Sequence, residues 1–154
     1  MSKYRFDGAF AVISGASSGI GREIASILCN KYGCTVIGLA RDEERLKSAS
    51  EAIGNNFIPF VCDITNDDDR EKLLAFITEN GYKPDILINN AGILPPFSHF
   101  LPEKTEALER VMEVNFHSHV KMCAAFLPLL LKSERGAIVN VASSAALATL
   151  PGTS

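Results

Sequence analysis

The stretch Ser14-Gly15-Ala16-Ser17-Ser18-Gly19-Ile20-Gly21 follows an apolar run and leads into a segment with helical periodicity. Gly15 permits a tight turn, Gly19 lets the backbone approach a bound group, and Gly21 leaves room for the helix to pack on the strand. Glycines at this spacing also suit a purely structural turn. At a strand-to-helix turn, however, backbone N–H groups and the helix N-terminus face an anion. The spacing therefore predicts a phosphate-binding turn for a dinucleotide, formed by Gly15, Ser17, Ser18, Gly19, Ile20 and Gly21.

The rest of the chain alternates short apolar runs with longer amphipathic segments. We expect strands at 9–14, 35–40, 57–62, 85–89 and 137–142, and helices at 19–32, 42–53, 67–80 and 103–132. Nearly continuous apolar runs are typical of strands that are covered on both faces. The pattern predicts an α/β fold with a three-layer doubly wound parallel sheet. Because a dinucleotide-binding turn follows its first strand, we expect the Rossmann type, with strand order 3-2-1-4-5, in one NAD(P)-binding domain over residues 1–154.

Residues at the ends of the expected helices agree with this assignment. Gly33 follows the first helix, where a left-handed cap is common. Asn66 precedes three aspartates and is expected to cap the third helix, whose positive end suits those charges. Pro84 prevents that helix from continuing into the next strand.

Composition excludes several classes of function. The 154 residues include 47% hydrophobic and 21% charged residues, with a net charge of −3, so no broad basic surface for nucleic acid is expected. The four cysteines form no Cys-x-x-Cys pair, which argues against a metal site. The longest apolar run, Met122 to Leu131, is too short to span a membrane, and the first residues lack a secretory pattern. We expect a cytoplasmic protein with reduced thiols.

Two charged residues follow the second and third expected strands. Ala40 occupies the position where a carboxylate would bind the adenosine ribose and repel a 2′-phosphate, and Arg41 comes next. Arg41 therefore favours NADP over NAD, unless it is simply one charge of a solvated helix start that includes Asp42. Asp63, with Ile64 beside it, is placed to accept from the adenine amino group, or else to cap the next helix.

Polar residues also mark the fourth and fifth expected strands and the long helix. Asn89-Asn90-Ala91-Gly92 closes the fourth strand, where buried asparagines need partners. Asn115 falls on the apolar side of the helix, which makes it either a structural latch or part of a site. His117 falls on the polar side. Ser143 and Ser144 follow the fifth strand and border the crevice that the glycine turn faces.

Together these motifs closely resemble the short-chain dehydrogenase/reductase family over nearly the whole chain. Ser14 stands where threonine is usual before the glycines. The resemblance implies that Asp63 and Ile64 contact adenine and that Asn90, Ala91 and Gly92 border the cofactor. It also implies catalytic roles for Asn115 and Ser143, the latter chosen over Ser144 by register.

The resemblance implies hydride transfer between NADP(H) and a small-molecule carbonyl or alcohol, in a protein that is a homo-oligomer when intact. It also implies a Tyr-x-x-x-Lys motif about thirteen residues after the serine, which is two positions beyond Ser154. We therefore expect the chain to stop before that motif. The alternative is a non-catalytic dinucleotide-binding module or pseudoenzyme fragment, although a sheet that ends at its fifth strand would expose core residues.

Overall fold

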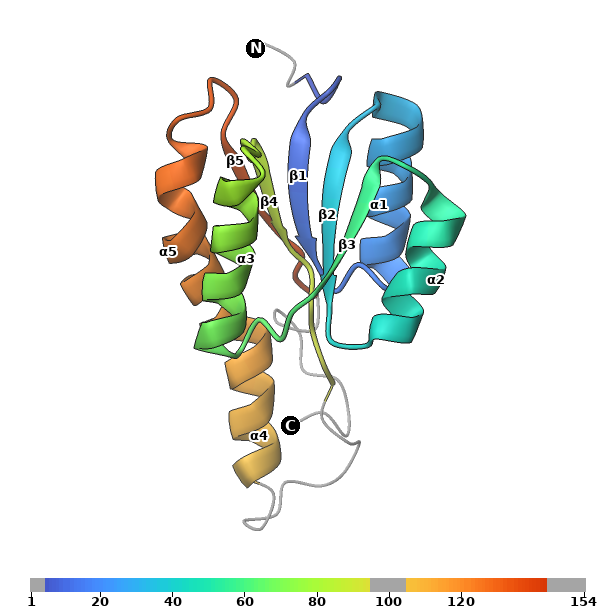
Figure 1. Ribbon diagram of the computed structural model, residues 1–154. Helices are drawn as coiled ribbons and strands as arrows, with labels where there is room; N and C mark the ends of the chain where they lie inside the picture. The colour runs from blue at the N-terminus through green and yellow to red at the C-terminus, as the bar shows by residue number, and fades with distance from the viewer. Residues whose placement is uncertain (1–4, 95–104, 144–154) are drawn as a thin grey trace.

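A computed structural model describes residues 5–94 and 105–143 (Figure 1). The described elements follow one another in strict strand–helix alternation up to β4. The strands are β1 (Phe10–Ser14), β2 (Thr35–Ala40), β3 (Phe57–Val61), β4 (Ile86–Asn89) and β5 (Ala137–Asn140). The helical elements are α1 (Gly19–Tyr32), α2 (Glu43–Ile53), α3 (Asp67–Glu79), α4 (Thr105–Met112), the π-helical segment η2 (Glu113–His117) and α5 (Ser118–Leu130).

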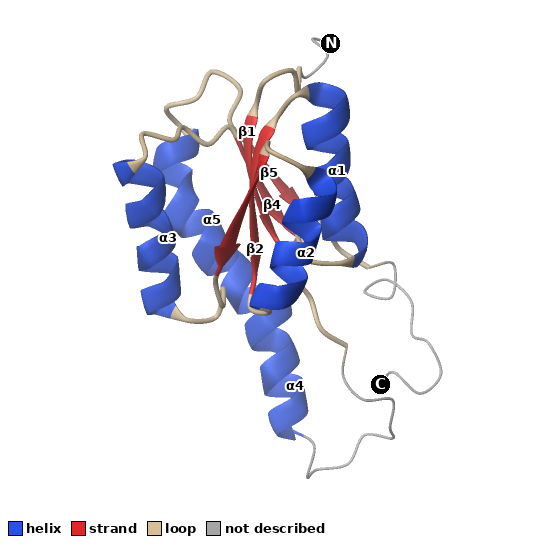
Figure 2. Cartoon of the chain, turned by 45° about the vertical axis from the view of Figure 1, so that its right-hand side comes forward, coloured by secondary structure: helices blue, strands red, loops and turns tan. Residues whose placement is uncertain are grey.

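The five strands form one parallel sheet in the order β3-β2-β1-β4-β5, which confirms the predicted topology. Figure 2 shows α1 and α2 on one face of the sheet and α3 and α5 on the other. Each face has its own apolar core. Leu28 of α1 and Leu46 of α2 belong to the first, and Leu73 of α3 and Phe126 of α5 belong to the second. This three-layer arrangement explains why the central strands β1, β2 and β4 are apolar almost throughout.

The edge strands depart from that pattern. In β3 only the first residue, Phe57, is buried, and in β5 no residue is. Continuous apolar sequence therefore overstates how well these two strands are covered, because each has a neighbouring strand on only one side within the described sheet. Several expected elements also run one or two residues too long, and Val141 and Ala142 lie beyond the end of β5.

The caps inferred from sequence are present. Gly33 ends α1 in the left-handed conformation, with φ of 62°. Asn66 caps α3, because its side chain accepts a hydrogen bond from the Asp69 N–H at 3.2 Å. Asp42 caps α2 in the same way through Arg45 N, so it precedes the helix rather than starting it.

The long helix expected at 103–132 is helical from Thr105 to Leu130, but a π-helical turn divides it; residues 103 and 104 lie outside the described part. A π turn holds more residues than an α turn and shifts the faces of the helix that follows. Buried residues then recur every four positions at Val114, Ser118, Met122, Phe126 and Leu130. The prediction that Asn115 lies on the core side was wrong: it is exposed, as are Leu108 and Met112.

Candidate cofactor-binding site

A cleft of about 870 Å³ opens at the carboxyl ends of β1, β2, β3 and β4. Ligands of open α/β sheets bind at this edge. The cleft is lined by every cofactor residue expected from sequence except Gly19 and Gly21, namely Gly15, Ser17, Ser18, Ile20, Arg41, Asp63, Ile64, Asn90, Ala91 and Gly92. Sequence reasoning placed Ala40 and Asp42 beside Arg41, but it missed Leu39, Arg45, Cys62, Ile93 and Val114 as lining residues. The available signal was that Cys62 and Ile93 are adjacent in sequence to Asp63 and Gly92.

The glycine turn has the backbone that its sequence predicts. Gly15 and Gly19 have φ of 69° and 53°, in the left-handed region that favours glycine. A Cβ on Gly15 would lie 2.9 Å from Ala91 Cα, and a Cβ on Gly21 would lie 2.3 Å from Gly15 O. Around Gly19, by contrast, nothing lies within 4 Å of such a Cβ. Gly15 and Gly21 are thus required by packing, whereas Gly19 leaves open space that suits a bound group.

The N-terminus of α1 has the features of an anion-binding site. Ser18 precedes the helix in an extended conformation, and its side chain makes no capping hydrogen bond. The first turn contains no acidic residue. The first N–H groups of a helix have no partner within the helix and carry its positive dipole. These features agree better with a site for the phosphates of a dinucleotide than with a purely structural role for the turn.

Ser14 and Asn90 join the glycine turn to the loop after β4. Ser14 is fully buried, and its Oγ accepts the N–H groups of Asn90 and Ala91, both at 3.0 Å. Asn90 Nδ2 in turn donates to Ser14 O at 3.0 Å and to Gly15 O at 3.3 Å. The neighbouring Asn89 is buried and donates to Asn140 Oδ1 at 2.9 Å, which links β4 to β5. These bonds give each amide nitrogen a partner, whereas Asn89 Oδ1 is buried without one among the described residues.

Arg41 lies at the mouth of the cleft, half exposed, with its NH1 3.8 Å from Asp63 Oδ2. Asp42 beside it is occupied elsewhere, because its carboxylate caps α2 and lies 3.2 Å from Arg45 Nε. The cap and the Arg45 guanidinium offset the charge of Asp42. Two cations therefore line this side of the cleft, and Arg45 is paired with Asp42, whereas Arg41, directly after β2, has only the longer contact with Asp63.

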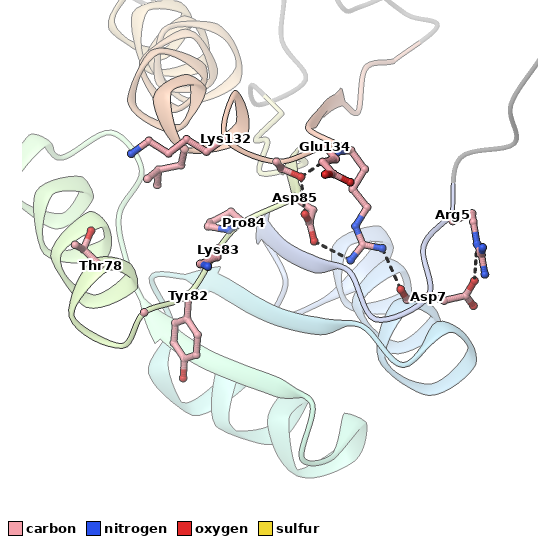
Figure 3. A pocket seen from close by; sticks show the side chains of 13 residues that line it. Arg5, Asp7, Thr78, Tyr82, Lys83, Pro84, Asp85, Lys132 and Glu134 are labelled. Carbon is pink, nitrogen blue, oxygen red and sulfur yellow. Dashed lines mark hydrogen bonds and ion pairs between the residues drawn. The ribbon is translucent and has the colours of Figure 1, made fainter.

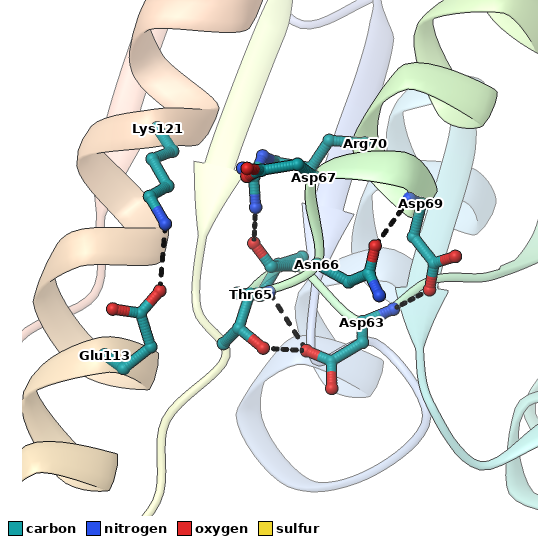
Figure 4. Close-up of polar contacts among 9 residues, drawn as sticks. Asp63, Thr65, Asn66, Asp67, Asp69, Arg70, Glu113 and Lys121 are labelled. Carbon is teal, nitrogen blue, oxygen red and sulfur yellow. Dashed lines mark hydrogen bonds and ion pairs between the residues drawn. The ribbon is translucent and has the colours of Figure 1, made fainter.

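Asp63 holds the loop after β3 rather than capping α3. Its Oδ1 accepts from Thr65 N at 3.0 Å and from Thr65 Oγ1 at 2.7 Å (Figure 4). Burial works to raise the pKa of Asp63, but these hydrogen bonds, with Arg41 and Arg110 nearby, outweigh burial and lower the pKa below its usual value. Asp63 is thus an anion at neutral pH, and Oδ2 is left for a donor from the cleft.

Asn115 is a latch on the loop after β4. Its Oδ1 accepts the Ile93 N–H and its Nδ2 donates to Ile93 O, both at 2.8 Å. One turn further along, His119 Nε2 lies 2.8 Å from Ala91 O. The π-helical turn therefore places two side chains of one helix on a loop that lines the cleft. His117 is exposed, as expected from its position.

Ser143 follows β5 and is exposed. Val141 N donates to Asn89 O at 2.9 Å, so the chain continues past β5 beside the end of β4. This contact puts Ser143 at the carboxyl edge of the sheet, the same edge as the glycine turn. Ser144 lies outside the described residues.

A second, larger hollow of about 1120 Å³ lies at the opposite end of the sheet (Figure 3). It is lined by residues that precede β1, β4 and β5, including Asp7, Asp85 and Arg135. Asp85 accepts from Phe10 N at 2.9 Å and from Ser133 Oγ at 2.6 Å, and lies 3.2 Å from Arg135. These groups tie the starts of three strands together, which is a structural role. The amino ends of parallel strands also lack the loops that bind ligands in this type of sheet.

The described residues give no support to metal chemistry or to a membrane segment. They contain no cluster of histidine, cysteine and carboxylate side chains suited to a metal ion. Cys62 lies at the cleft, but burial raises the pKa of its thiol to about 12, so it stays protonated. No helix in the described ranges is long and apolar enough to cross a bilayer.

Comparison with known proteins identifies the family. A family model for short chain dehydrogenase matches residues 9–154. The 3-oxoacyl-(acyl-carrier-protein) reductase FabG of Buchnera aphidicola is 35% identical over 133 residues, covering 86% of this chain and 54% of that protein. The NADPH-dependent pterin aldehyde reductase of Arabidopsis thaliana is 33% identical over 134 residues, covering 86% of this chain and 55% of that protein. The chain belongs to the short chain dehydrogenase family.

The fold comparison agrees with this assignment. The crystal structure of the KRED1-Pglu enzyme matches 95% of this chain and 61% of its own, with a TM-score of 0.85. At 24% identity this likeness bears on the fold alone. The chain spans a little over half the length of the two curated relatives described above.

Proposed function

We propose that this chain binds NADP(H) and forms the cofactor-binding part of an oxidoreductase acting on a small-molecule carbonyl or alcohol. The observation that carries the proposal is the cleft at the carboxyl ends of β1 to β4, where the uncapped start of α1 lies across from Arg41 and Asp63. Membership of the short chain dehydrogenase family supports the same class of reaction. The Arabidopsis relative, named as NADPH-dependent, supports the phosphorylated cofactor.

Each part of the dinucleotide has a matching part of the cleft. The pyrophosphate binds the backbone of the glycine turn, over the open space at Gly19. The adenine amino group donates to Asp63, beside Ile64. The loop of Asn90, Ala91 and Gly92 borders the nicotinamide half. When bound, the nicotinamide supplies or accepts the hydride.

Arg41 selects the 2′-phosphate. In the structure its guanidinium pairs with Asp63 at 3.8 Å, a distance beyond that of a good hydrogen bond. A phosphate offers two oxygens to the planar guanidinium and forms shorter, charge-assisted bonds. Arg41 therefore exchanges a loose partner for a tight one when NADP(H) binds. No such gain is available from the ribose hydroxyl of NAD(H).

Asn115 and Ser143 serve the reaction itself. Asn115 hydrogen-bonds both the N–H and the carbonyl of Ile93 beside the cleft. In the reaction, Asn115 holds a backbone carbonyl or a water in a proton relay. Ser143 donates a hydrogen bond to the substrate oxygen and so stabilises charge that develops there. These roles follow the family resemblance and agree with the position of both residues at the carboxyl edge of the sheet.

Titration calorimetry with NADPH and NADH tests the proposal. We expect NADPH to bind at least about tenfold more tightly, since loss of one charge-assisted contact costs about that much. Arg41→Ala should lower the affinity for NADPH and leave the affinity for NADH unchanged. Lys47→Ala, which removes an exposed cation from α2 outside the cleft, is the matched control and should alter neither. Equal affinity for both cofactors in the wild type would overturn the choice of NADP, and no binding of either would overturn the cofactor site.

A further inference from the structure

Among the described residues, Arg70 is the only charged residue that is buried, with 8% of its surface exposed. It lies in the first turns of α3, and nothing in the sequence around it, Asp67-Asp68-Asp69-Arg70-Glu71-Lys72, distinguishes it from a solvated helix surface. Burying a guanidinium is unfavourable unless its donors are satisfied, and an apolar residue of similar size commonly packs at least as well. The charge of Arg70 therefore needs an explanation beyond packing.

The contacts of Arg70 provide one. Its NH1 donates to the backbone carbonyl of Ile64 at 2.6 Å, and its NH2 binds Asp67, whose own side chain is largely exposed (Figure 4). Ile64 is buried and also lines the cleft. Arg70 thus reaches back from α3 to hold the carbonyl of Ile64, the residue that follows Asp63.

The rest of the β3–α3 loop is held from the same helix turn. Asp69 Oδ2 accepts the N–H of Asp63 at 3.0 Å, and Asn66 N donates to Asp63 O at 2.9 Å. Thr65 donates twice to Asp63 Oδ1, so four hydrogen bonds fix Asp63 on its N-terminal side and within the turn. The Arg70 bond fixes the peptide on its C-terminal side. Asp63 Oδ2 is then the one carboxylate oxygen turned toward Arg41 and the cleft.

We propose that Arg70 is a positioning residue for the adenosine end of the cofactor cleft: by holding the Ile64 carbonyl, it fixes Asp63 and Ile64 where adenine binds. The inference rests on the proposed function, because it assumes that adenine lies against these two residues. Arg70 itself touches no cofactor. It acts through the β3–α3 loop, so its removal should weaken binding of the adenosine half of the dinucleotide and leave binding of the nicotinamide half unchanged.

The test compares two halves of the cofactor on the same variants. The probes are 2′,5′-ADP, which carries adenine and the 2′-phosphate, and nicotinamide mononucleotide, which carries neither; both are titrated by NMR. We expect Arg70→Met to lower the affinity for 2′,5′-ADP about fivefold, the effect of losing one ordinary hydrogen bond. The affinity for nicotinamide mononucleotide should not change. Arg70→Lys keeps one donor for Ile64 O and should restore most of the affinity. Lys83→Met removes the same charge from an exposed site at the far end of the sheet and should change neither probe.

A second readout follows the loop directly. Amide hydrogen exchange at Asp63 and Thr65, both hydrogen-bonded in the structure, should be faster in Arg70→Met than in the wild type. If Arg70→Met does not fold, Asp67→Asn removes the exposed carboxylate that holds the other side of the guanidinium. That variant should also weaken 2′,5′-ADP selectively.

The outcomes separate this inference from the proposed function. Wild-type chain that binds neither probe contradicts the cofactor site itself. Wild-type chain that binds both, with Arg70→Met or Asp67→Asn weakening both equally or neither, overturns the positioning role and leaves the cofactor site intact. Unchanged exchange at Asp63 and Thr65 in Arg70→Met likewise overturns it.

Discussion

Ser14 and Asn90 hydrogen-bond each other twice, once through each side chain. Ser14 Oγ accepts the Asn90 N–H at 3.0 Å, and Asn90 Nδ2 donates to Ser14 O at 3.0 Å. Ser14 ends β1 and Asn90 follows β4, so the pair fixes the glycine turn to the loop beside it. These bonds shape the cleft, and a substitution at Ser14, which does not line it, should alter binding without removing any group that touches the ligand.

Replacement of Ser14 by alanine tests this connection. The N–H groups of Asn90 and Ala91 lose their acceptor in a buried site, which should cost about 1–3 kcal/mol of unfolding free energy. Urea denaturation measures that loss, and NADPH affinity should fall with it because the glycine turn loosens. Ser26→Ala, which removes a hydroxyl that binds Asn30 at 3.3 Å on α1, is the matched control. Stability equal to that of the control would contradict the role of Ser14.

Two glycines of the turn should respond differently to alanine. In Gly21→Ala the new Cβ meets Gly15 O at 2.3 Å and Asn90 Nδ2 at 2.4 Å, so both folding stability and NADPH binding should be lost. In Gly19→Ala no protein atom is near, and the φ of 53° alone should cost about 1–2 kcal/mol. NADPH affinity should nevertheless fall steeply in Gly19→Ala, since the methyl group occupies the space proposed for the pyrophosphate. Thermal unfolding with and without NADPH separates the two effects, and unimpaired binding in folded Gly19→Ala would remove the phosphate from this place.

Asp63 should stabilise the fold in a pH-dependent way. Hydrogen bonds and nearby arginines hold its pKa below 3.8, so its contribution is present above that unfolded value and is lost as the pH falls through the folded pKa. The difference in unfolding free energy between the wild type and Asp63→Asn should therefore be constant from neutral pH to about pH 5 and shrink below pH 4. Urea unfolding at a series of pH values measures it. A difference that grows on acidification would mean that the pKa of Asp63 is raised instead.

The latch between Asn115 and Ile93 predicts a further effect. Asn115→Ala leaves both the N–H and the carbonyl of Ile93 without this partner, so the Ile93 amide should exchange faster and NADPH affinity should fall about five- to tenfold. Asn115→Asp keeps an acceptor for the N–H and should fall between wild type and alanine. Asn80→Ala is the control, because it removes a comparable side-chain bond, to Phe76 O, from the other end of the molecule. Affinity unchanged in Asn115→Ala would show that Ile93 holds its position without the latch.

Much of this structure follows from local sequence. Apolar runs locate β1, β2 and β4, and Gly33 and Asn66 locate helix ends. Each of these depends on a few neighbouring residues, whose conformational preferences act wherever the chain is placed. The cleft followed as well, because the carboxyl ends of parallel strands share one edge.

Other features depend on partners that are remote in sequence. A helical wheel assumes a constant 3.6 residues per turn, so it placed Asn115 in the core and could not anticipate the π turn that carries it to Ile93. Arg70 reads as a surface cation because its burial depends on the loop that folds back over α3. Asn90 lines the cleft as expected, but its sequence position could not show that its side-chain nitrogen binds two carbonyls of the glycine turn.

The 154 residues should bind NADPH without catalysing its oxidation by carbonyl compounds. Proton transfer to the substrate oxygen needs a positioned acid, which the family resemblance gives to a tyrosine. The sequence contains Tyr4, Tyr32 and Tyr82. Tyr32 ends α1, and Tyr82 lines the hollow at the amino ends of the strands. Both therefore lie at the end of the sheet opposite the cleft. Tyr4 lies outside the described residues. Calorimetry should detect NADPH binding, while absorbance at 340 nm should stay constant with a panel of aldehydes and ketones. Steady turnover by the purified chain, abolished by Ser143→Ala, would instead mean that another group supplies the proton.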